Sequence, residues 1–285
     1  MVGSPVKRVG RPDPELVREA LSIVRSRGIR LSRERGQHVM VSREALEAIC
    51  SAAEPISLHR VLEIGPGFGF LTEEILRRGP SSLLAVELDP AMVEVLRSRL
   101  GGRRGLRIVL GDGLRYVESG EYDLLISNPP FSVSSRLILG LIDADFRSAS
   151  ITLQSEFVRR LTARPGTDFY GSMSVLAQLR FRIEPIALVR RDAFLPPPRV
   201  SVTLVRLEPR GGLLRELGIL KRVLPSIFSR RKRKVGRVLD AVLKSMGIPE
   251  GLSGLPLRID PEERVYKISP EKYLEIAREI REVLG

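Results

Sequence analysis

Four consecutive residues, Asn128, Pro129, Pro130 and Phe131, suit one narrow kind of chemistry. They directly follow the run 122–127, which has the apolar composition of a buried strand. A strand that ends in this way presents an amide oxygen, a backbone carbonyl and an aromatic ring at one point. Two such acceptors can draw the exocyclic amine of a base toward a more nucleophilic state, while the ring stacks on the base. The alternative is a strand-to-loop turn in which the prolines only restrict the backbone.

A second motif, Gly-Pro-Gly-Phe-Gly at 65–69, joins an apolar strand at 60–64 to a helical stretch. A doubly wound α/β fold binds its nucleotide ligand at this position. Phe70 stands where a dinucleotide-binding loop would have its next glycine, and Glu63 adds a negative charge that opposes a phosphate. The loop therefore favours a cationic ligand such as S-adenosylmethionine over NAD.

Two further carboxylates follow the next strands along the chain. Glu87 ends the strand 82–88, where it can accept hydrogen bonds from both hydroxyls of a ribose. Asp112 follows the strand 106–110 and is placed to accept from the adenine amine of the cofactor. An Asx turn explains Asp112 almost as well, and a solvent-facing charge at a strand end is the alternative for Glu87.

Short β-branched runs alternate with helical patterns along the middle of the chain, which predicts a doubly wound sheet. The expected strands are 60–64, 82–88, 106–110, 122–127, 148–154, 182–190 and 200–207, and the expected helices are 71–78, 91–100, 135–142, 156–163 and 172–180. Only nine residues, 191–199, precede the last strand, which is too short for a parallel crossover. A mostly parallel sheet with an antiparallel last strand is typical of class I (Rossmann-like) S-adenosylmethionine methyltransferases.

The strand character stops after 209–212, and the remaining pattern predicts a small all-helical domain. Its expected helices are 213–224, 235–246 and 270–284, and two more are expected near the N-terminus at 13–27 and 42–53. We therefore predict a basic N-terminal extension, a methyltransferase domain and a helical RNA-binding domain, which span 1–34, 35–208 and 209–285.

The net charge of +13 is confined to the two ends of the chain. Residues 1–43 hold 10 Lys and Arg against 4 Asp and Glu, residues 209–285 hold 17 against 10, and residues 44–208 hold 20 of each sign. This distribution indicates a small-molecule site flanked by surfaces for a polyanion, with a solvated basic surface as the alternative.

A dense basic block lies in the C-terminal part, beside the apolar series Phe228, Val235, Val238, Leu239 and Val242. The pattern predicts a helix with one buried face and one cationic face that binds RNA. A solvated helix or a localisation signal is the alternative. The predicted RNA-binding residues are Arg230, Arg231, Lys232, Arg233, Lys234 and Arg237.

Cysteine and histidine are too scarce for a disulfide framework or a zinc site, because the chain has one cysteine, Cys50, and two histidines, His38 and His59. No bound metal is expected. Cys50 lies in an apolar helical stretch and is expected in the core, which argues against covalent catalysis by a thiol. With a single cysteine and without a signal sequence or a run that could span a membrane, the chain is expected in the cytoplasm. A monomer is the simplest assumption for its oligomeric state.

Several sequence blocks, taken in order from about residue 35 to the C-terminus, resemble the KsgA/Dim-type ribosomal RNA adenine N6,N6-dimethyltransferases. The blocks are 36–40, 63–67, 153–161, 170–178, 194–200 and 228–234. The chain departs from the family where 36–40 reads Gly-Gln-His-Val-Met in place of Gly-Gln-Asn-Phe-Leu. It departs again at Asn-Pro-Pro-Phe, where Asn-Leu-Pro-Tyr is frequent, so the ring is kept and its hydroxyl is lost.

The resemblance implies a role for each matching position. It implies cofactor contacts at His38, Met40, Gly65, Glu87, Asp112 and Asn128. Asn128 and the carbonyl of Pro129 would also accept from the target amine, and Phe131 and Phe194 would hold a flipped adenine between their rings. From the residues alone, a core position under the hairpin is the better interpretation of Phe194.

The resemblance also implies a substrate, namely two adjacent adenosines in the 3′-terminal hairpin of small-subunit rRNA, each methylated twice at N6 in an assembling particle. The expected chemistry is direct in-line transfer of a methyl group to nitrogen, without a covalent intermediate. Three alternatives remain open at this stage: a DNA adenine-N6 methyltransferase, a large-subunit rRNA methyltransferase and a non-catalytic ribosome assembly factor.

Overall fold

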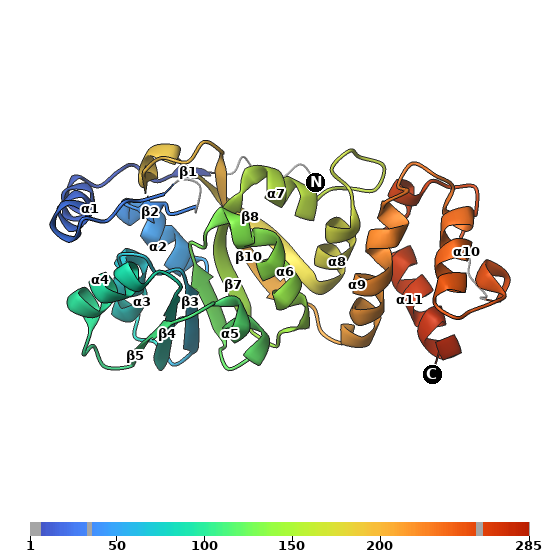
Figure 1. Cartoon of the computed structure of the whole chain (residues 1–285), viewed down its shortest axis with the longest axis horizontal. Coiled ribbons are helices and arrows are strands. Elements are labelled where there is room, and N and C mark those ends of the chain that lie inside the picture. The colour runs from blue at the N-terminus through green and yellow to red at the C-terminus, as the bar shows by residue number, and fades with distance from the viewer. Residues whose placement is uncertain (1–6, 33–35, 255–258, 285) are drawn as a thin grey trace. The chain divides into compact units, whose positions relative to one another are not determined.

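The computed structural model describes residues 7–32, 36–254 and 259–284 (Figure 1). Parts of the three predicted regions lie outside the described residues: 1–6 and 33–34 of the extension, 35 of the methyltransferase domain, and 255–258 and 285 of the helical domain. The chain divides into two compact units. The first contains 1–158 and 184–209, and the second contains 159–183 and 210–285.

Among the described residues, eight strands form one sheet in the order β1-β8-β10-β7-β6-β3-β4-β5. The strands are β1 (Lys7–Val9), β3 (Arg60–Ile64), β4 (Ser82–Glu87), β5 (Leu106–Leu110), β6 (Leu124–Ser127), β7 (Ser148–Gln154), β8 (Phe181–Val189) and β10 (Val202–Pro209). Neighbouring strands from β7 to β5 are parallel, whereas β10 runs antiparallel to β7 with Val202 opposite Gln154. The predicted Rossmann-like sheet with an antiparallel last strand is confirmed.

The helices of the first unit lie on both sides of this sheet (Figure 1). Two of them begin at residues that cap helices well, since Asp13 and Ser42 accept hydrogen bonds from backbone amides of the first turn. The helices that were predicted by residue range are present within a few residues of their expected bounds. The helices are α1 (Pro14–Arg27), α2 (Arg43–Ser51), α3 (Phe70–Arg77), α4 (Pro90–Leu100), α5 (Leu114–Ser119) and α6 (Ser134–Asp143), followed by α7 (Ser155–Leu161) and the 3-10 turns η1 (Phe131–Val133) and η2 (Arg191–Ala193).

The described N-terminal residues, 7–32, are folded into the first unit. Strand β1 pairs in parallel with β8, with Arg8 opposite Leu188. Leu16 and Ala20 of α1 are buried in the core, and the backbone amide of Asp13 donates to the carbonyl of Val41 (2.7 Å). This basic segment therefore holds fixed positions at the β1–β8 edge of the sheet.

A second, two-stranded sheet joins sequence blocks that are far apart in the chain. It pairs β2 (Val39–Met40) with β9 (Phe194–Leu195) in an antiparallel arrangement that places Met40 opposite Phe194. His38 precedes β2, and its Nδ1 donates to the carbonyl of Pro196 at 2.7 Å, since a carbonyl can only accept. This pairing fixes the residues around His38 relative to the loop that follows β9.

The second unit is helical and is built around three aromatic rings. The ring centroid of Phe228 lies 5.8 Å from that of Tyr170 and 5.6 Å from that of Tyr273. Both tyrosine hydroxyls are satisfied by backbone carbonyls, those of Ile268 (2.7 Å) and Val265 (2.8 Å). The elements are α8 (Ser172–Arg180), α9 (Leu214–Phe228), α10 (Val235–Ser245), η3 (Gly251–Gly254), η4 (Val265–Lys267) and α11 (Pro270–Leu284).

The predicted helix through the basic block is wrong. Helix α9 ends at Phe228 and α10 begins at Val235, so residues 230–234 form the turn between them. The amide of Arg233 donates to the carbonyl of Arg230 (2.8 Å), which closes this turn. The apolar series that suggested one helix is divided between two helices, because Phe228 is the last residue of α9 and the other four residues lie in α10.

Candidate active site

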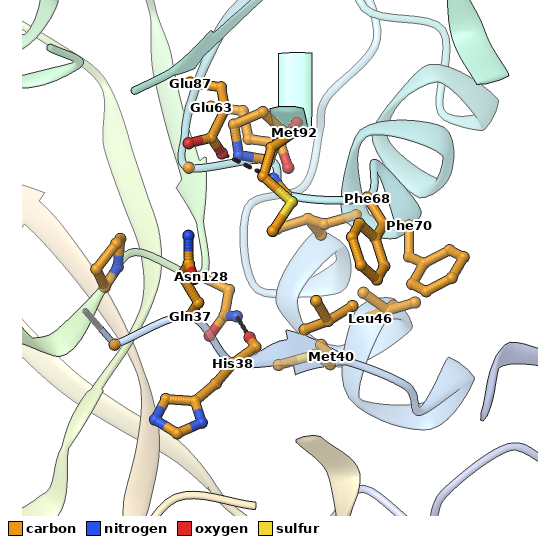
Figure 2. A pocket seen from close by; sticks show the side chains of 17 residues that line it. Gln37, His38, Met40, Leu46, Glu63, Phe68, Phe70, Glu87, Met92 and Asn128 are labelled. Carbon is orange, nitrogen blue, oxygen red and sulfur yellow. Dashed lines mark hydrogen bonds between the residues drawn. The ribbon is translucent and has the colours of Figure 1, made fainter. Parts of the chain in front are cut away.

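A pocket with an empty volume of about 610 Å³ lies at the carboxyl ends of β3, β4 and β6, the edge at which this class of sheet binds ligands. In the view of Figure 2 the carboxylates of Glu63 and Glu87 lie at one end and His38 lies at the other. The lining residues are Gly36, Gln37, His38, Val39, Met40, Leu46, Glu63, Gly65, Pro66, Gly67, Phe68, Phe70, Leu71, Glu87, Met92, Asn128 and Pro130.

The carboxylate of Glu87 is held in place by three backbone amides, two from the next residues in the chain and one from the glycine loop. Its Oε2 accepts from the amide of Gly67 (3.1 Å), and its Oε1 accepts from those of Leu88 (2.8 Å) and Asp89 (3.0 Å). Burial raises the pKa of this carboxyl, and the three amides oppose that shift. A carboxylate has about four acceptor positions, so Oε2 of Glu87 can still accept from a hydroxyl group in the pocket.

Glu63 is buried, with 1 % of its surface exposed, and its Oε2 has no hydrogen-bond partner among the described residues. Burial raises its pKa to about 8, with a smaller contribution from the charge of Glu87. The nearby hydroxyl of Thr72 lowers the pKa of Glu63 by less than burial raises it, although the two groups are not in hydrogen-bond contact. An unsatisfied acid that lines a pocket fits a ligand that brings a positive charge or a donor.

The glycine loop allows a close approach between two backbone segments. Gly65 has φ of 66°, in the left-handed region, and a Cβ there would lie 3.2 Å from Cδ of Pro130. Its amide donates to the carbonyl of Val86 (2.9 Å), and the hydroxyl of Ser127 donates to the carbonyl of Ile64 (2.6 Å). The cofactor loop and the end of β6 are therefore connected to each other and to β4.

The orientation of the Asn128 amide is fixed by its two partners. Its Nδ2 donates to the carbonyl of His38 (3.1 Å), which can only accept, so the oxygen must face the other way (Figure 2). There Oδ1 accepts from the hydroxyl of Thr152 (2.5 Å). An amide oxygen has two lone pairs, and the second is left for a donor in the pocket.

A second acceptor follows directly in the chain. Within the described part of the chain, the carbonyl of Pro129 accepts no hydrogen bond, whereas that of Pro130 accepts from the amide of Val133 (3.1 Å). The carbonyl of Pro129 is therefore available to a ligand, whereas Pro130 caps the 3-10 turn η1.

A wider hollow, with an empty volume of about 1560 Å³, adjoins this site and contains the ring of Phe131. The rings of His38 and Phe131 have centroids 5.6 Å apart and an interplanar angle of 31°. His38 and Gly36 line both the hollow and the pocket, so the two spaces meet at these residues. The hollow is lined by Leu31, Ser32, Gly36, His38, Phe131, Ser132, Gln154, Pro196, Pro198, Arg199 and Val200.

The structure brings most of the predicted site residues together. His38, Met40, Gly65, Glu87 and Asn128 line one pocket, and Phe131 lines the adjoining hollow. Pro129 lies between Asn128 and Phe131 in the chain and lines neither space.

Asp112 and Phe194 lie outside both spaces. Oδ1 of Asp112 accepts from the amide of Leu114 (3.0 Å), which is the Asx turn weighed above. Phe194 is 1 % exposed and packs in the hydrophobic core. Its stacking role stays a prediction that requires the ring to leave the core, and the adenine contact of Asp112 also stays a prediction.

The sequence did not predict several residues of the site, among them Thr152, Met92 and Gln37. Thr152 orients Asn128, Met92 lines the pocket, and Gln37 fixes the loop before β2 because it donates to Asp89 (2.9 Å) and accepts from the amide of Ser32 (3.0 Å). Thr152 did not stand out in the sequence, because its strand also contains Ser148 and Ser150. Gln37 carried a signal, since it lies in the block 36–40 that resembles the family.

The predicted RNA-binding residues divide into two groups. Arg231 donates to the carbonyls of Thr167 and Asp168 (both 2.9 Å), and its guanidinium lies 5.3 Å from the ring centroid of Tyr266. Lys234 forms an ion pair with Glu262. The side chains of Arg230, Lys232, Arg233 and Arg237 are exposed.

No helix among the described residues is long and apolar enough to cross a membrane. The same part of the chain contains no group of three or more His, Cys, Asp or Glu side chains placed to hold a metal ion.

Comparisons with known proteins agree over almost the whole chain. The family model of ribosomal RNA adenine dimethylase matches residues 29–282. A probable ribosomal RNA small subunit methyltransferase A from Methanothermobacter thermautotrophicus is 33% identical over 95% of this chain and 98% of its own length. The protein of the same name from Methanopyrus kandleri is 35% identical over 94% of this chain and 99% of its own.

Solved structures share the fold. A dimethyladenosine transferase from Plasmodium falciparum superposes with a TM-score of 0.71 at 23% identity, over 86% of this chain and 98% of that one. The 23S rRNA methyltransferase ErmE superposes with a TM-score of 0.61 at 21% identity, over 85% of this chain and 99% of that one.

The family match confirms the expected cofactor, S-adenosylmethionine. Its positive charges fit the unsatisfied Glu63, and its ribose fits the immobilised Glu87. With the family model matching from residue 29 to residue 282, this chain belongs to the ribosomal RNA adenine dimethylase family.

Proposed function

We propose that this protein dimethylates N6 of two adjacent adenosines in the 3′-terminal hairpin of small-subunit rRNA, within an assembling small subunit. The observation that carries the proposal is the fixed amide of Asn128, whose oxygen keeps an open lone pair beside the unpaired carbonyl of Pro129. The names of the two archaeal relatives support the small subunit as the source of the RNA.

When bound, S-adenosylmethionine supplies an electrophilic methyl group on a positively charged sulfur. Glu63 and Glu87 would hold the cofactor in the pocket, and the oxygens of Asn128 and Pro129 would accept from the two N6 hydrogens of the target adenine. These acceptors would favour a pyramidal amine and stabilise the positive charge that develops on nitrogen as the new N–C bond forms and the bond from the methyl group to sulfur breaks. The cofactor would leave as the neutral thioether, and the extra N6 proton would leave to solvent. The monomethylated adenine, held against Phe131, could then accept a second methyl group from a second cofactor molecule.

The exposed basic residues of the second unit would bind rRNA phosphates, namely Arg230, Lys232, Arg233 and Arg237. Arg231 and Lys234 would instead stabilise the turn 230–234. The guanidinium of Arg231 contacts two backbone carbonyls and the ring of Tyr266, and the ammonium group of Lys234 pairs with Glu262. We infer that the protein acts as a monomer in the cytoplasm.

The proposed substrate is tested by incubating the protein with labelled cofactor and three nucleic acids: immature small subunits, large-subunit rRNA and duplex DNA. We expect mass spectrometry of RNA digests to show N6,N6-dimethyladenosine at two neighbouring positions of the small-subunit 3′ hairpin. Incorporation only into large-subunit rRNA or DNA would reject the substrate, and incorporation into none would reject the activity.

Thr152→Val removes the hydroxyl that orients Asn128, so we expect methyl transfer to slow by about two- to tenfold, the worth of one hydrogen bond. The KM for cofactor should change little, and Thr152→Ser should restore the rate. Thr203→Val on the neighbouring strand is the matched control, because Thr203 is also buried and pairs with the hydroxyl of Ser155 (2.8 Å). Equal rates for Thr152→Val and Thr203→Val would remove the positioning role.

The raised pKa of Glu63, about 8, has a consequence for cofactor binding. The carboxyl is mostly protonated at pH 7 in the free protein, and a nearby cation favours its ionised form, so binding at pH 7 should release most of one proton. Calorimetry in buffers of different ionisation enthalpy measures this release. The proton release should vanish well above pH 8 in the parent protein, and at pH 7 in the variant Glu63→Gln. Identical proton release by parent and variant at pH 7 would show that Glu63 does not meet the cofactor's charge.

A further inference from the structure

A second hollow of the first unit, with an empty volume of about 1600 Å³, has five charged residues among the eleven that line it. It is formed by β1, the end of β8 and the loop that leads into β10. None of the predicted site residues lines it. Its lining consists of Arg8, Leu188, Val189, Arg190, Arg191, Asp192, Pro197, Pro198, Arg199, Ser201 and Val202.

The charge of this hollow is strongly positive, because four arginines face one aspartate. Arg190 and Asp192 neutralise each other through two hydrogen bonds, from Nε to Oδ1 (2.9 Å) and from an Nη to Oδ2 (2.7 Å). The guanidiniums of Arg8, Arg191 and Arg199 form no ion pair with any carboxylate of the described residues. Three positive charges therefore remain uncompensated in one concave surface.

The backbone holds these arginines in defined places. Arg8 lies on β1 in register with Leu188, and the amide of Arg190 donates to the carbonyl of Val9 (2.9 Å). An Nη of Arg191 donates to the carbonyl of Arg199 (3.2 Å), which joins the two ends of the loop. Arginines carried by an ordered backbone lose less entropy on binding an anion than those of a disordered basic tail, because only their side chains remain to be ordered.

The position of the hollow indicates which anion it would meet. Pro198 and Arg199 line both this hollow and the one that contains Phe131, so a single loop separates the two. An RNA strand with its target base against Phe131 would have its neighbouring phosphates close to this loop.

We propose that Arg8, Arg191 and Arg199 bind the phosphates of the RNA strand that flanks the target adenosine. This inference rests on the proposed function and adds a backbone-binding surface on the catalytic unit. Guanidinium groups are suited to bidentate contacts with phosphate, and such contacts position a nucleic acid without reading its sequence. It also assigns a role to the basic N-terminal segment, since β1 supplies Arg8.

The test compares the triple variant Arg8→Gln/Arg191→Gln/Arg199→Gln with the control Arg103→Gln/Arg104→Gln/Arg107→Gln. Both remove three charges from exposed residues of the first unit, and the control residues line none of the hollows described here. The measurements are the affinity for a naked small-subunit rRNA transcript as a function of salt, the KM for immature small subunits and the Kd for cofactor.

For the triple variant we expect the slope of log affinity against log salt to become shallower by about 2, which corresponds to three lost contacts on a single strand. The KM for immature subunits should rise about tenfold or more, with an unchanged Kd for cofactor and parental behaviour of the control. Equal slopes for the two variants would overturn the inference. So would a raised KM for subunits with a parental slope on naked RNA, since the partner would then be a protein.

The inference and the proposed function fail in different ways. If the parent protein methylates no small-subunit rRNA, the proposed function is rejected, whereas the salt slopes still report whether the hollow binds RNA. If the parent methylates this RNA and the triple variant matches the control in slope and KM, only the phosphate surface is rejected.

Discussion

The structure of the catalytic site depends on one amide group whose orientation is imposed from both sides. The carbonyl of His38 requires the nitrogen of Asn128 to face it, and the hydroxyl of Thr152 then meets the oxygen. A freely rotating amide would present a donor to the target amine as readily as an acceptor, which would repel the group that must react. Fixing the amide before the substrate arrives avoids this reorganisation in the transition state.

The rest of the first unit holds Asn128 and its two partners, His38 and Thr152, in place. Strands β6 and β7 are parallel and in register up to Ser127 and Ile151, so the residues that follow, Asn128 and Thr152, come side by side. His38 is brought to them by the pairing of β2 with β9 and by its bond to Pro196. Each contact joins segments far apart in the sequence, so the acceptor geometry is a product of the complete sheet.

The sequence predicted the local elements well because their signals are local. Short apolar, β-branched runs predicted every strand of the large sheet except β1. The short stretch 191–199 correctly predicted that the last strand is antiparallel. The glycine loop and two of the acids at strand ends line the pocket as predicted, since parallel strands bring their carboxyl ends to one edge, whereas Asp112 does not line it.

The features that were missed depend on tertiary contacts. Nothing local shows that β1 pairs with β8, that Thr152 orients Asn128 or that Phe194 enters the core. The basic block was placed on a helix because apolar residues at helical spacing surround it, yet these residues belong to two helices joined by the charged turn. Periodicity reports which residues are buried, and it does not report where one helix ends and the next begins.

The most direct test of the acceptor geometry is the single-turnover rate of methyl transfer to immature small subunits by Asn128→Ala, measured together with the Kd for cofactor. The rate should fall by about 10²–10³-fold, as when a preorganised polar group is removed from a reacting centre, while the Kd changes by less than about tenfold. A variant that transfers methyl groups at the parental rate would contradict this prediction.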